Sequence, residues 1–421
     1  MAQQPPNVFQ NPEIVKRLLL TLGCVTVYII GRSIPLPGLH PGYLAAILSG
    51  ASETPLRSVS IFGLGVAPYL GAAVLLSLLR ATGRIEALAG RDAEGRRGIY
   101  RAARLLAAVF AVGHAALLTI GIAGAPAATL ETGLRFFVPA AATLAAGAML
   151  VLWLAEEISE NGVGSGVLLM LFVDIAAKAP GGIATLNTLV KNEDIGMPAA
   201  LGIAALVLLA LYAAVFIESA QRKIPVQYAK RVIGRMMVGG QQTTVPVKVN
   251  PAGVLALIAA ATVAAWPAAL SAALRHPAFY FPLFAALVVV FSRLYRTSGV
   301  DPRELTGQIQ HNGGFILGIR SGDAMVGYFS RLLERLSLSS AIPVAAVAVV
   351  PAAALRLTGS SAALGEVSIY LLAAVALDFV GQVQARAMMQ NLGGSLPKPG
   401  SMKSGGQRQR PRSSKRRKKR R

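Results

Sequence analysis

The chain has 421 residues, of which 54% are hydrophobic and only 14% charged, and its 41 Lys and Arg stand against 19 Asp and Glu. This apolar content exceeds what one soluble core needs, so composition excludes an ordinary soluble enzyme or binding module and predicts a polytopic membrane protein. A single cysteine, Cys24, excludes an internal disulfide and a cysteine-based metal site, and we interpret it as a packing residue.

The apolar residues are grouped into ten blocks, most of them of a length that crosses a bilayer core as a helix. The polar segment MAQQPPNVFQNPE precedes the first block and no small-residue cleavage site follows it, so this block is expected to remain as a helix. The fifth and the last blocks are short. The predicted spans are residues 18–34, 61–79, 102–123, 136–154, 166–179, 200–217, 252–274, 279–295, 341–357 and 367–380.

The cations indicate which loops share a side of the membrane. If loops alternate between the two sides from the N-terminus onward, most of the 41 Lys and Arg fall on the side of that terminus. Cytoplasmic loops carry such an excess, so this side and both termini are predicted to be cytoplasmic. The Lys and Arg that fall within the spans or on the other side are Arg32, Arg57, Arg135, Lys178, Lys191, Arg275 and Arg356.

The longest basic loop has a strand pattern of its own. In QRKIPVQYAKRVIGR, apolar Ile224, Val226 and Tyr228 alternate with polar neighbours, and three alternating valines follow the turn signal Gly239-Gly240. This pattern predicts a β-hairpin-like arm at about residues 218–250. Its cations, which we propose as partner-binding residues, are Arg222, Lys223, Lys230, Arg231 and Arg235.

A second arm is predicted at about residues 296–340. DPRELTGQIQ has a helical pattern, Asn312-Gly313 is a turn signal, and FILGIRSG is expected to form a short strand with Arg320 near its end.

Residues 395–421 form a tail without an apolar core, rich in Gly, Ser, Pro and Gln and ending in a block of cations. Such a tail is predicted to be disordered and to bind a polyanion, either ribosomal RNA or anionic lipid.

Two explanations fit the basic arms. They can act only as topology determinants attracted to anionic lipid, or they can dock a large anionic partner, which their length and strand pattern favour.

Inside the spans, Asp174, Lys178 and Asp378 are the main ionisable residues. Asp174 and Lys178 can form a proton relay, but a structural pair one helical turn apart is the favoured interpretation. The four histidines are scattered, and we predict no enzyme, cofactor or metal site.

Several segments resemble signature sequences of the SecY family, the large subunits of the protein-conducting channel of bacterial plasma and thylakoid membranes. The resemblance recurs in order from about residue 14 to 395. The segments are SIFGLGVAPYLGAAVLLSLL (60–79), WLAEEISENGVGSGVLLMLF (153–172), QRKIPVQYAKRVIGR (221–235), VPVKVNPAG (245–253), GGFILGIRSG (313–322) and VALDFVGQVQ (375–384).

The resemblance implies an all-α fold of ten transmembrane helices in two pseudo-symmetric five-helix halves around an hourglass pore. The halves would be residues 18–190 and 191–394, preceded by a cytoplasmic segment at 1–17. A plug helix would lie within about residues 39–60, although this segment lacks the family's Phe-rich character. The ring of aliphatic side chains that seals the pore would be Val66, Leu70, Val167, Leu171, Ile258 and Leu371.

The function implied is that of the central translocon subunit, which passes unfolded secretory polypeptides and releases apolar segments through a lateral gate. Its implied partners are SecE, SecG and, on the cytoplasmic face, the SecA motor ATPase or the ribosome, with Arg320 matching a functionally sensitive arginine. The bacterial plasma membrane is the expected location, ahead of the thylakoid. The alternative is a ten-helix secondary transporter, which would need several buried acids or bases near mid-membrane.

Overall fold

The structure is a computed structural model whose described residues are 12–48, 59–81, 93–124, 128–131, 133–192, 195–228, 231–233, 236–238, 242–270, 276–297, 300–357 and 365–395. Within them, eight helices are long and apolar enough to cross a membrane, and two shorter apolar helices begin at Ala67 and Gly253. The chain is therefore a multi-pass membrane protein, and the predicted all-helical membrane fold is confirmed.

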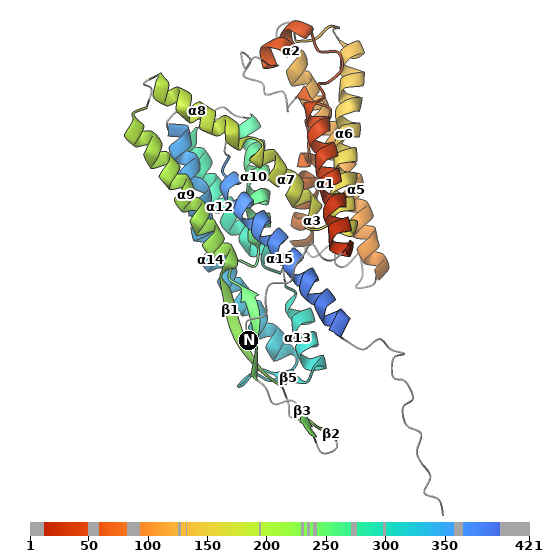
Figure 1. Cartoon of the computed structure of the whole chain (residues 1–421), viewed down its shortest axis with the longest axis vertical. Helices are drawn as coiled ribbons and strands as arrows, with labels where there is room; N and C mark the ends of the chain where they lie inside the picture. Colours follow the sequence, from red (N-terminus) through yellow and green to blue (C-terminus); the bar gives the residue numbers. More distant parts are fainter. Residues whose placement is uncertain are drawn as a thin grey trace, which may run out of the picture.

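The N-terminal part forms one group of helices, at the upper right of Figure 1, with α7 and α8 leading away from it. The helices are α1 (Pro12–Ser33), α2 (Pro41–Leu48), α3 (Ala67–Ala81), α5 (Ala93–Ala123), α6 (Leu134–Asn161), α7 (Gly166–Ala176) and α8 (Ala179–Lys191). The predicted fifth span, residues 166–179, thus coincides with α7 and ends where α8 begins.

The C-terminal part forms a second group, at the left of Figure 1, with α15 running from it toward the first group. The helices are α9 (Met197–Ser219), α10 (Gly253–Leu270), α12 (Pro277–Leu294), a 3-10 turn at Tyr295–Thr297, α13 (Pro302–His311), α14 (Asp323–Leu357) and α15 (Ser368–Ser395). Each of the ten predicted spans coincides with at least one helix of the two groups, and α5, α6, α14 and α15 extend well beyond the apolar blocks into polar sequence.

Small residues allow helices of the first group to approach each other closely. A Cβ atom on Gly166, the first residue of α7, would lie 1.9 Å from the carbonyl oxygen of Ala155 in α6. Only glycine fits there, so the GSG of residues 164–166 sets how α7 turns back against α6. Such contacts replace the hydrophobic driving force that helices lack in lipid.

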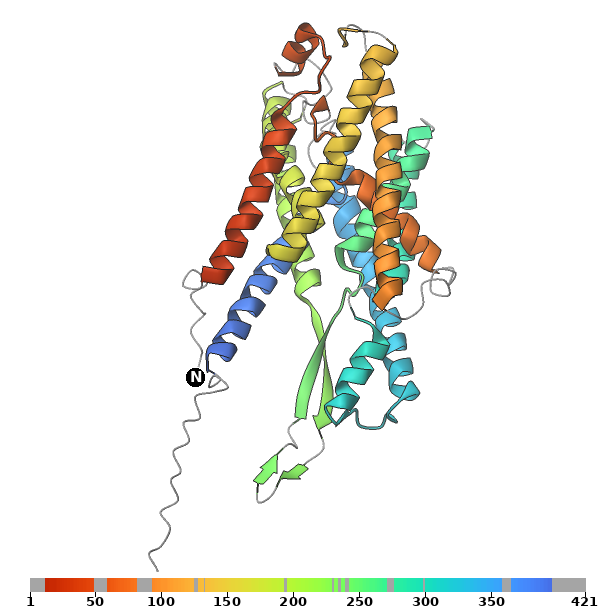
Figure 2. The ribbon, with the colours of Figure 1, turned by 90° about the vertical axis from the view of Figure 1, so that its right-hand side faces the viewer.

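The predicted hairpin is a pair of strands that projects below the helices in Figure 2. Strand β1 (Gln221–Tyr228) pairs antiparallel with β4 (Gln242–Lys248), in a register that joins Gln221 to Lys248 and Gln227 to Gln242. A small two-stranded sheet of β2 (Arg231–Ile233) and β3 (Met236–Val238) lies between them in sequence. The predicted turn at residues 239–240 lies outside the described residues.

The second predicted arm is confirmed in its helix but wrong in its strand. Helix α13 begins behind the Asp301 cap, whose Oδ1 accepts from Arg303 N at 2.8 Å, and Gly313 has the positive φ of a turn. The strand β5 is only Gly314–Phe315 and pairs with the end of β1. It ends early because a turn follows directly, in which Ile319 N donates to Ile316 O at 3.1 Å and Gly318 adopts a left-handed φ of 78°.

The two arms are one unit rather than two, because they share a hydrophobic core. Ile224 and Val226 of β1 are buried together with Ile309 of α13 and Phe329 of α14. We call this unit, residues 221–248 and 300–336 as far as they are described, the arm domain.

Candidate functional site

The six residues expected to form a ring lie on α3, α7, α10 and α15 or directly before them. Val66 is 3% exposed, Ile258 6% and Leu371 1%, whereas Leu70, Val167 and Leu171 are half-buried. Aliphatic residues in such a protein can instead be ordinary core or lipid-facing residues. Burial excludes a lipid-facing position for Val66, Ile258 and Leu371, whereas a core position and a closed ring both require it.

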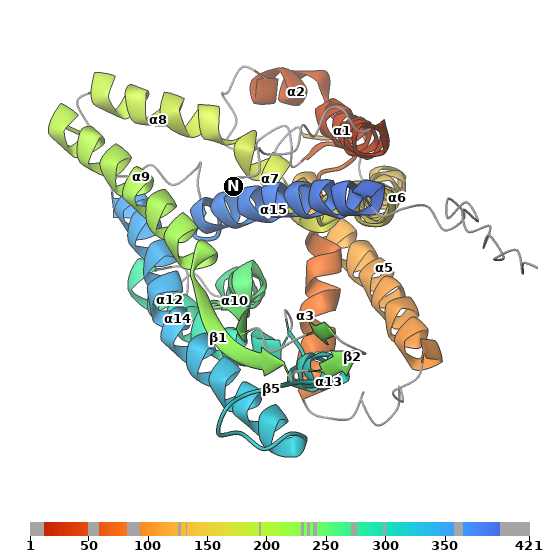
Figure 3. The same ribbon diagram turned by 60° about the horizontal axis from the view of Figure 1, so that its bottom comes forward.

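These four helices meet at the seam between the two groups of helices. Helix α3 contacts α10, α10 contacts α15, and α15 contacts α7, and Figure 3 shows α15 running across the middle of the molecule, from α9 toward α6. Leu70 and Leu171 pack against both the core of the first group and that of the second. The candidate site is this aliphatic seam, which brings together residues up to about 300 positions apart in sequence.

One edge of the seam is held by a hydrogen bond that the sequence analysis missed. The hydroxyl of Tyr295, directly after α12, lies 2.9 Å from Ser77 Oγ on α3. The Ser77 hydroxyl can accept this bond while donating to Val74 O at 2.6 Å. Besides this pair, α3 contacts both α10 and α12, so the two groups of helices meet along this edge.

A second missed feature is a polar cluster beside the seam, centred on Arg32 of α1. Its Nε lies 3.2 Å from Asp174 Oδ1 of α7, and its Nη1 lies 3.4 Å from Phe62 O, just before α3. Tyr28 donates to Asp174 Oδ2 at 2.9 Å. The favoured Asp174–Lys178 pair is therefore wrong, because the end of α1 brings a guanidinium to Asp174. The signal in sequence was the spacing of Tyr28 and Arg32, one turn apart on α1.

The arm cations lie on the outside of the arm domain where the structure describes them. Arg222 and Lys223 are exposed on β1, and Arg320 is exposed in the turn after β5. Arg231 lies in β2, while Lys230 and Arg235 lie outside the described residues. Because Ile224 and Val226 point into the core, strand alternation turns Lys223 toward solvent. Arg222 shares the face of Ile224 but lies near the start of the strand, where it is exposed.

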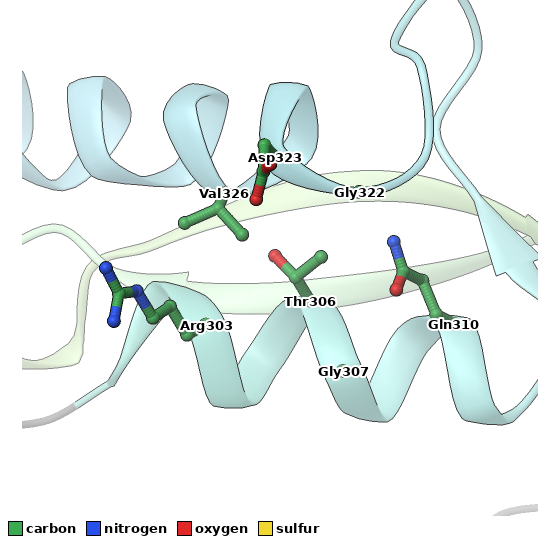
Figure 4. Close-up of a pocket in the computed structure, with 7 residues that line it drawn as sticks. All are labelled: Arg303, Thr306, Gly307, Gln310, Gly322, Asp323 and Val326. Carbon is green, nitrogen blue, oxygen red and sulfur yellow. The ribbon is translucent and has the colours of Figure 1, made fainter.

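An open groove of about 420 Å³ runs between α13 and the start of α14 in the arm domain. Figure 4 shows Arg303, Thr306 and Gln310 on one side and Asp323 and Val326 on the other. This groove is polar and lies outside the ten spans predicted from the sequence, which does not suit a substrate cavity of a membrane carrier. Among the described residues, no group of His, Cys, Asp and Glu could hold a metal ion.

Part of the expected plug segment is a short helix, α2, which lies at the upper end of the first group in Figure 1. Ile47 of α2 and Val59 pack with residues of the first group, including Leu144 of α6. The residues between them, 49–58, lie outside the described residues.

Comparison with known proteins gives consistent matches over nearly the whole chain. A family model for SecY matches residues 60–380. The protein translocase subunit SecY of Escherichia coli K12 is 29% identical over 94% of this chain and 98% of its own. The corresponding subunit of Thermus thermophilus is 31% identical over 93% of this chain and 96% of its own.

Solved structures show the same fold. The structure of a protein-conducting channel matches with a TM-score of 0.68 at 18% identity, covering 94% of this chain and 96% of its own. Sec61 in the canine ribosome–channel complex from the endoplasmic reticulum matches with a TM-score of 0.61 at 16% identity, with coverages of 94% and 96%.

Proposed function

The chain belongs to the SecY family of protein translocase subunits, and we propose on that premise that it forms the pore of a Sec translocon. It passes unfolded secretory polypeptides across the membrane and releases apolar segments into lipid. The observation that carries this proposal is the aliphatic seam, where side chains from α3, α7, α10 and α15 gather between two groups of helices.

The chemistry of the seam suits a sealed pore for polypeptides. A constriction of aliphatic side chains excludes water and therefore ions. It offers no hydrogen bond or charge that would retain one passing sequence over another. We assign the ring to Val66, Leu70, Val167, Leu171, Ile258 and Leu371, because the three buried members and the two that touch both cores lie where such a ring must close.

The lateral exit lies, in this proposal, between α3 and the pair α10 and α12. These helices belong to different groups, and the Tyr295–Ser77 hydrogen bond joins them at one end. Separating two helices that lie against lipid lets an apolar segment partition out of the pore without crossing a polar barrier.

The arm domain is the docking surface for a cytoplasmic partner, either the SecA motor ATPase or the ribosome. Its exposed Arg222, Lys223 and Arg320 support an anionic partner surface. SecE and SecG are the small subunits expected in the complex. We assign the chain to the bacterial plasma membrane, with both termini and the arm domain in the cytoplasm.

The alternative of a secondary transporter is not favoured. Such a carrier needs ionisable residues at a substrate site near mid-membrane, whereas the described ionisable cluster of Arg32 and Asp174 is internally paired.

Reconstitution tests the proposal. The chain is co-purified with its SecE and SecG subunits, placed in liposomes, and supplied with a secretory precursor and either SecA with ATP or translating ribosomes. We expect protease-protected precursor only in vesicles that contain the chain. Absence of protected precursor with both kinds of partner would contradict the proposed function.

A further inference from the structure

A buried polar cluster connects the root of the arm domain to the beginning of α15. Glu218, in the last turn of α9, is 8% exposed. Its Oε1 accepts from Lys248 Nζ of β4 at 3.0 Å, and its Oε2 accepts from the Tyr370 hydroxyl of α15 at 2.9 Å. Asn250 Nδ2 in turn donates to the Tyr370 hydroxyl at 2.7 Å. Both carboxylate oxygens are therefore engaged by different parts of the chain.

This arrangement is more than ordinary packing, because a buried carboxylate is costly unless it is paired and hydrogen-bonded. Glu218 satisfies that need with one charge from the arm and one hydroxyl from the pore side. If either partner is lost, the buried Glu218 carboxylate lacks one of the groups that stabilise its charge. The positions of Lys248 and Tyr370 therefore depend on each other through Glu218.

The arm side of the cluster is rigidly continuous with the sheet. Lys248 is the register partner of Gln221, the first residue of β1, and Val249 N donates to Ala220 O at 2.9 Å. Both strands thus leave the helices at the cluster, so a force that tilts the arm domain acts first on Lys248.

The pore side of the cluster ends next to the seam. Tyr370 is fully buried and is followed directly by Leu371, which is 1% exposed in the same core as Ile258. Both residues lie in the first turn of α15, which begins at Ser368. A shift of the Tyr370 ring therefore moves the backbone that carries Leu371.

We propose that Glu218 and Tyr370 are positioning residues that transmit the state of the arm domain to the Leu371 position of the ring. This inference rests on the proposed function and goes beyond it, since it names the path by which a docked partner weakens the seal. Tilting of the arm withdraws Lys248 from Glu218, the Glu218–Tyr370 bond changes with it, and α15 shifts at Leu371. By reciprocity, a polypeptide that displaces Leu371 alters the arm and its affinity for the partner.

The test is a double-mutant cycle on the reconstituted complex, with resting ion conductance in a planar bilayer as the readout and no partner added. Tyr370→Phe removes only the hydroxyl, and Lys248→Ala removes the arm's cation. Each single variant should raise the resting conductance. Tyr370→Phe should raise it by roughly tenfold for a lost bond to a charged group, and Lys248→Ala by less, because the Lys248 side chain is 53% exposed and solvent screens its charge. The double variant should leak no more than the leakier single variant, because both changes act through Glu218.

Matched controls are Tyr212→Phe on the exposed face of α9 and Lys191→Ala at the end of α8, both exposed in the structure. They should conduct as the unmodified channel does. Thermal unfolding of every variant is measured alongside, since a merely structural role would lower the melting temperature without changing the conductance.

Three outcomes decide the matter. Raised and non-additive conductance supports the inference. The inference is overturned if Tyr370→Phe and Lys248→Ala conduct as the unmodified channel does, or if their effects are fully additive. In that case, precursor translocation by the unmodified channel still supports the proposed function. If the unmodified channel translocates no precursor, both the proposed function and this inference are wrong.

Discussion

Ile258 of α10 is 6% exposed and packs in the same core as Leu371. In Ile258→Asn, a hydrogen-bonding amide replaces the aliphatic side chain at the proposed constriction, where it can hold water and weaken the closed state. We expect several-fold higher ion conductance in planar bilayers and better tolerance of precursors with defective signal sequences.

Ile258→Leu is the matched control, since it keeps the volume and the aliphatic character, and it should seal as the unmodified channel does. If Ile258→Asn conducts no more than Ile258→Leu, Ile258 packs between helices without lining the pore.

Arg32 and Asp174 are the second residue-scale feature that can be tested. Their side chains are only 13% and 18% exposed, so Asp174→Asn leaves a poorly solvated guanidinium without its carboxylate. Removal of one partner of such a pair costs about 3 kcal/mol, and we expect a clearly lower melting temperature of the purified complex.

Glu13→Gln serves as the control, because Glu13 pairs with Arg17 on an exposed helix face at 3.6 Å, an arrangement that contributes roughly 0.5 kcal/mol. Equal melting temperatures for Asp174→Asn and Glu13→Gln would show that the Arg32 cluster does not stabilise the fold.

At the scale of elements, the contact between α3 and the end of α12 depends on two hydroxyl groups, those of Ser77 and Tyr295. Ser77→Ala and Tyr295→Phe each remove one partner of a bond that contributes about 1 kcal/mol, or roughly fivefold in an opening equilibrium. We therefore expect either variant to insert weakly apolar signal segments more efficiently, and the double variant to match the single ones.

Ser33→Ala is the control for loss of a serine hydroxyl, because the Ser33 hydroxyl donates within its own helix, to Ile29 O at 3.1 Å. Unchanged insertion efficiency across a series of signal segments of graded hydropathy would rule out the Tyr295–Ser77 bond as a closing element.

Arg320 lies exposed in the turn that follows β5, so it can contact a docked partner without contributing to the arm core. Arg320→Glu should impair precursor translocation at least several-fold while leaving membrane abundance unchanged, because it reverses one charge on the docking surface. The measurement is partner binding and translocation in reconstituted vesicles. Arg135→Glu, an equal charge change on the predicted outer side, should have no effect, and equal behaviour of the two variants would remove Arg320 from the docking surface.

At the scale of the whole molecule, the formal net charge of +22 is concentrated in the arm domain and the tail. Deletion of residues 401–421 removes eleven Lys and Arg and no apolar core residue, so the pore should keep its resting conductance. If the tail binds ribosomal RNA, the truncated channel should bind ribosomes more weakly at low salt and show a flatter salt dependence, because fewer counterions are released.

A variant that keeps the tail's length but carries Gln in place of the eleven cations separates charge from length. It should behave as the truncated channel does. Equal ribosome affinity for all three forms throughout a salt titration would indicate that the tail acts on anionic lipid instead.

The spans and the arm strands could be predicted from sequence because their causes are local. Bilayer thickness requires long apolar runs, and these runs became α1, α5, α6, α9, α12, α14 and α15. Alternation of Ile224 and Val226 with polar residues likewise predicted β1, since one face of a strand must be buried. The ring residues came from a family resemblance, and the sequence alone supplied no distances among them.

Tertiary structure decided the polar pairings, and only the structure showed where the second-arm strand ends. Asp174 is one turn from Lys178 in sequence, yet it pairs with Arg32, 142 residues away, and Tyr370 bonds to Glu218, 152 residues away. β5 stops at Phe315 because the chain turns at residues 316–319, where Ile319 N donates to Ile316 O. Hydropathy and periodicity report which environment each residue needs, whereas its partner depends on which helices pack together, and that choice is made only when the whole chain is assembled.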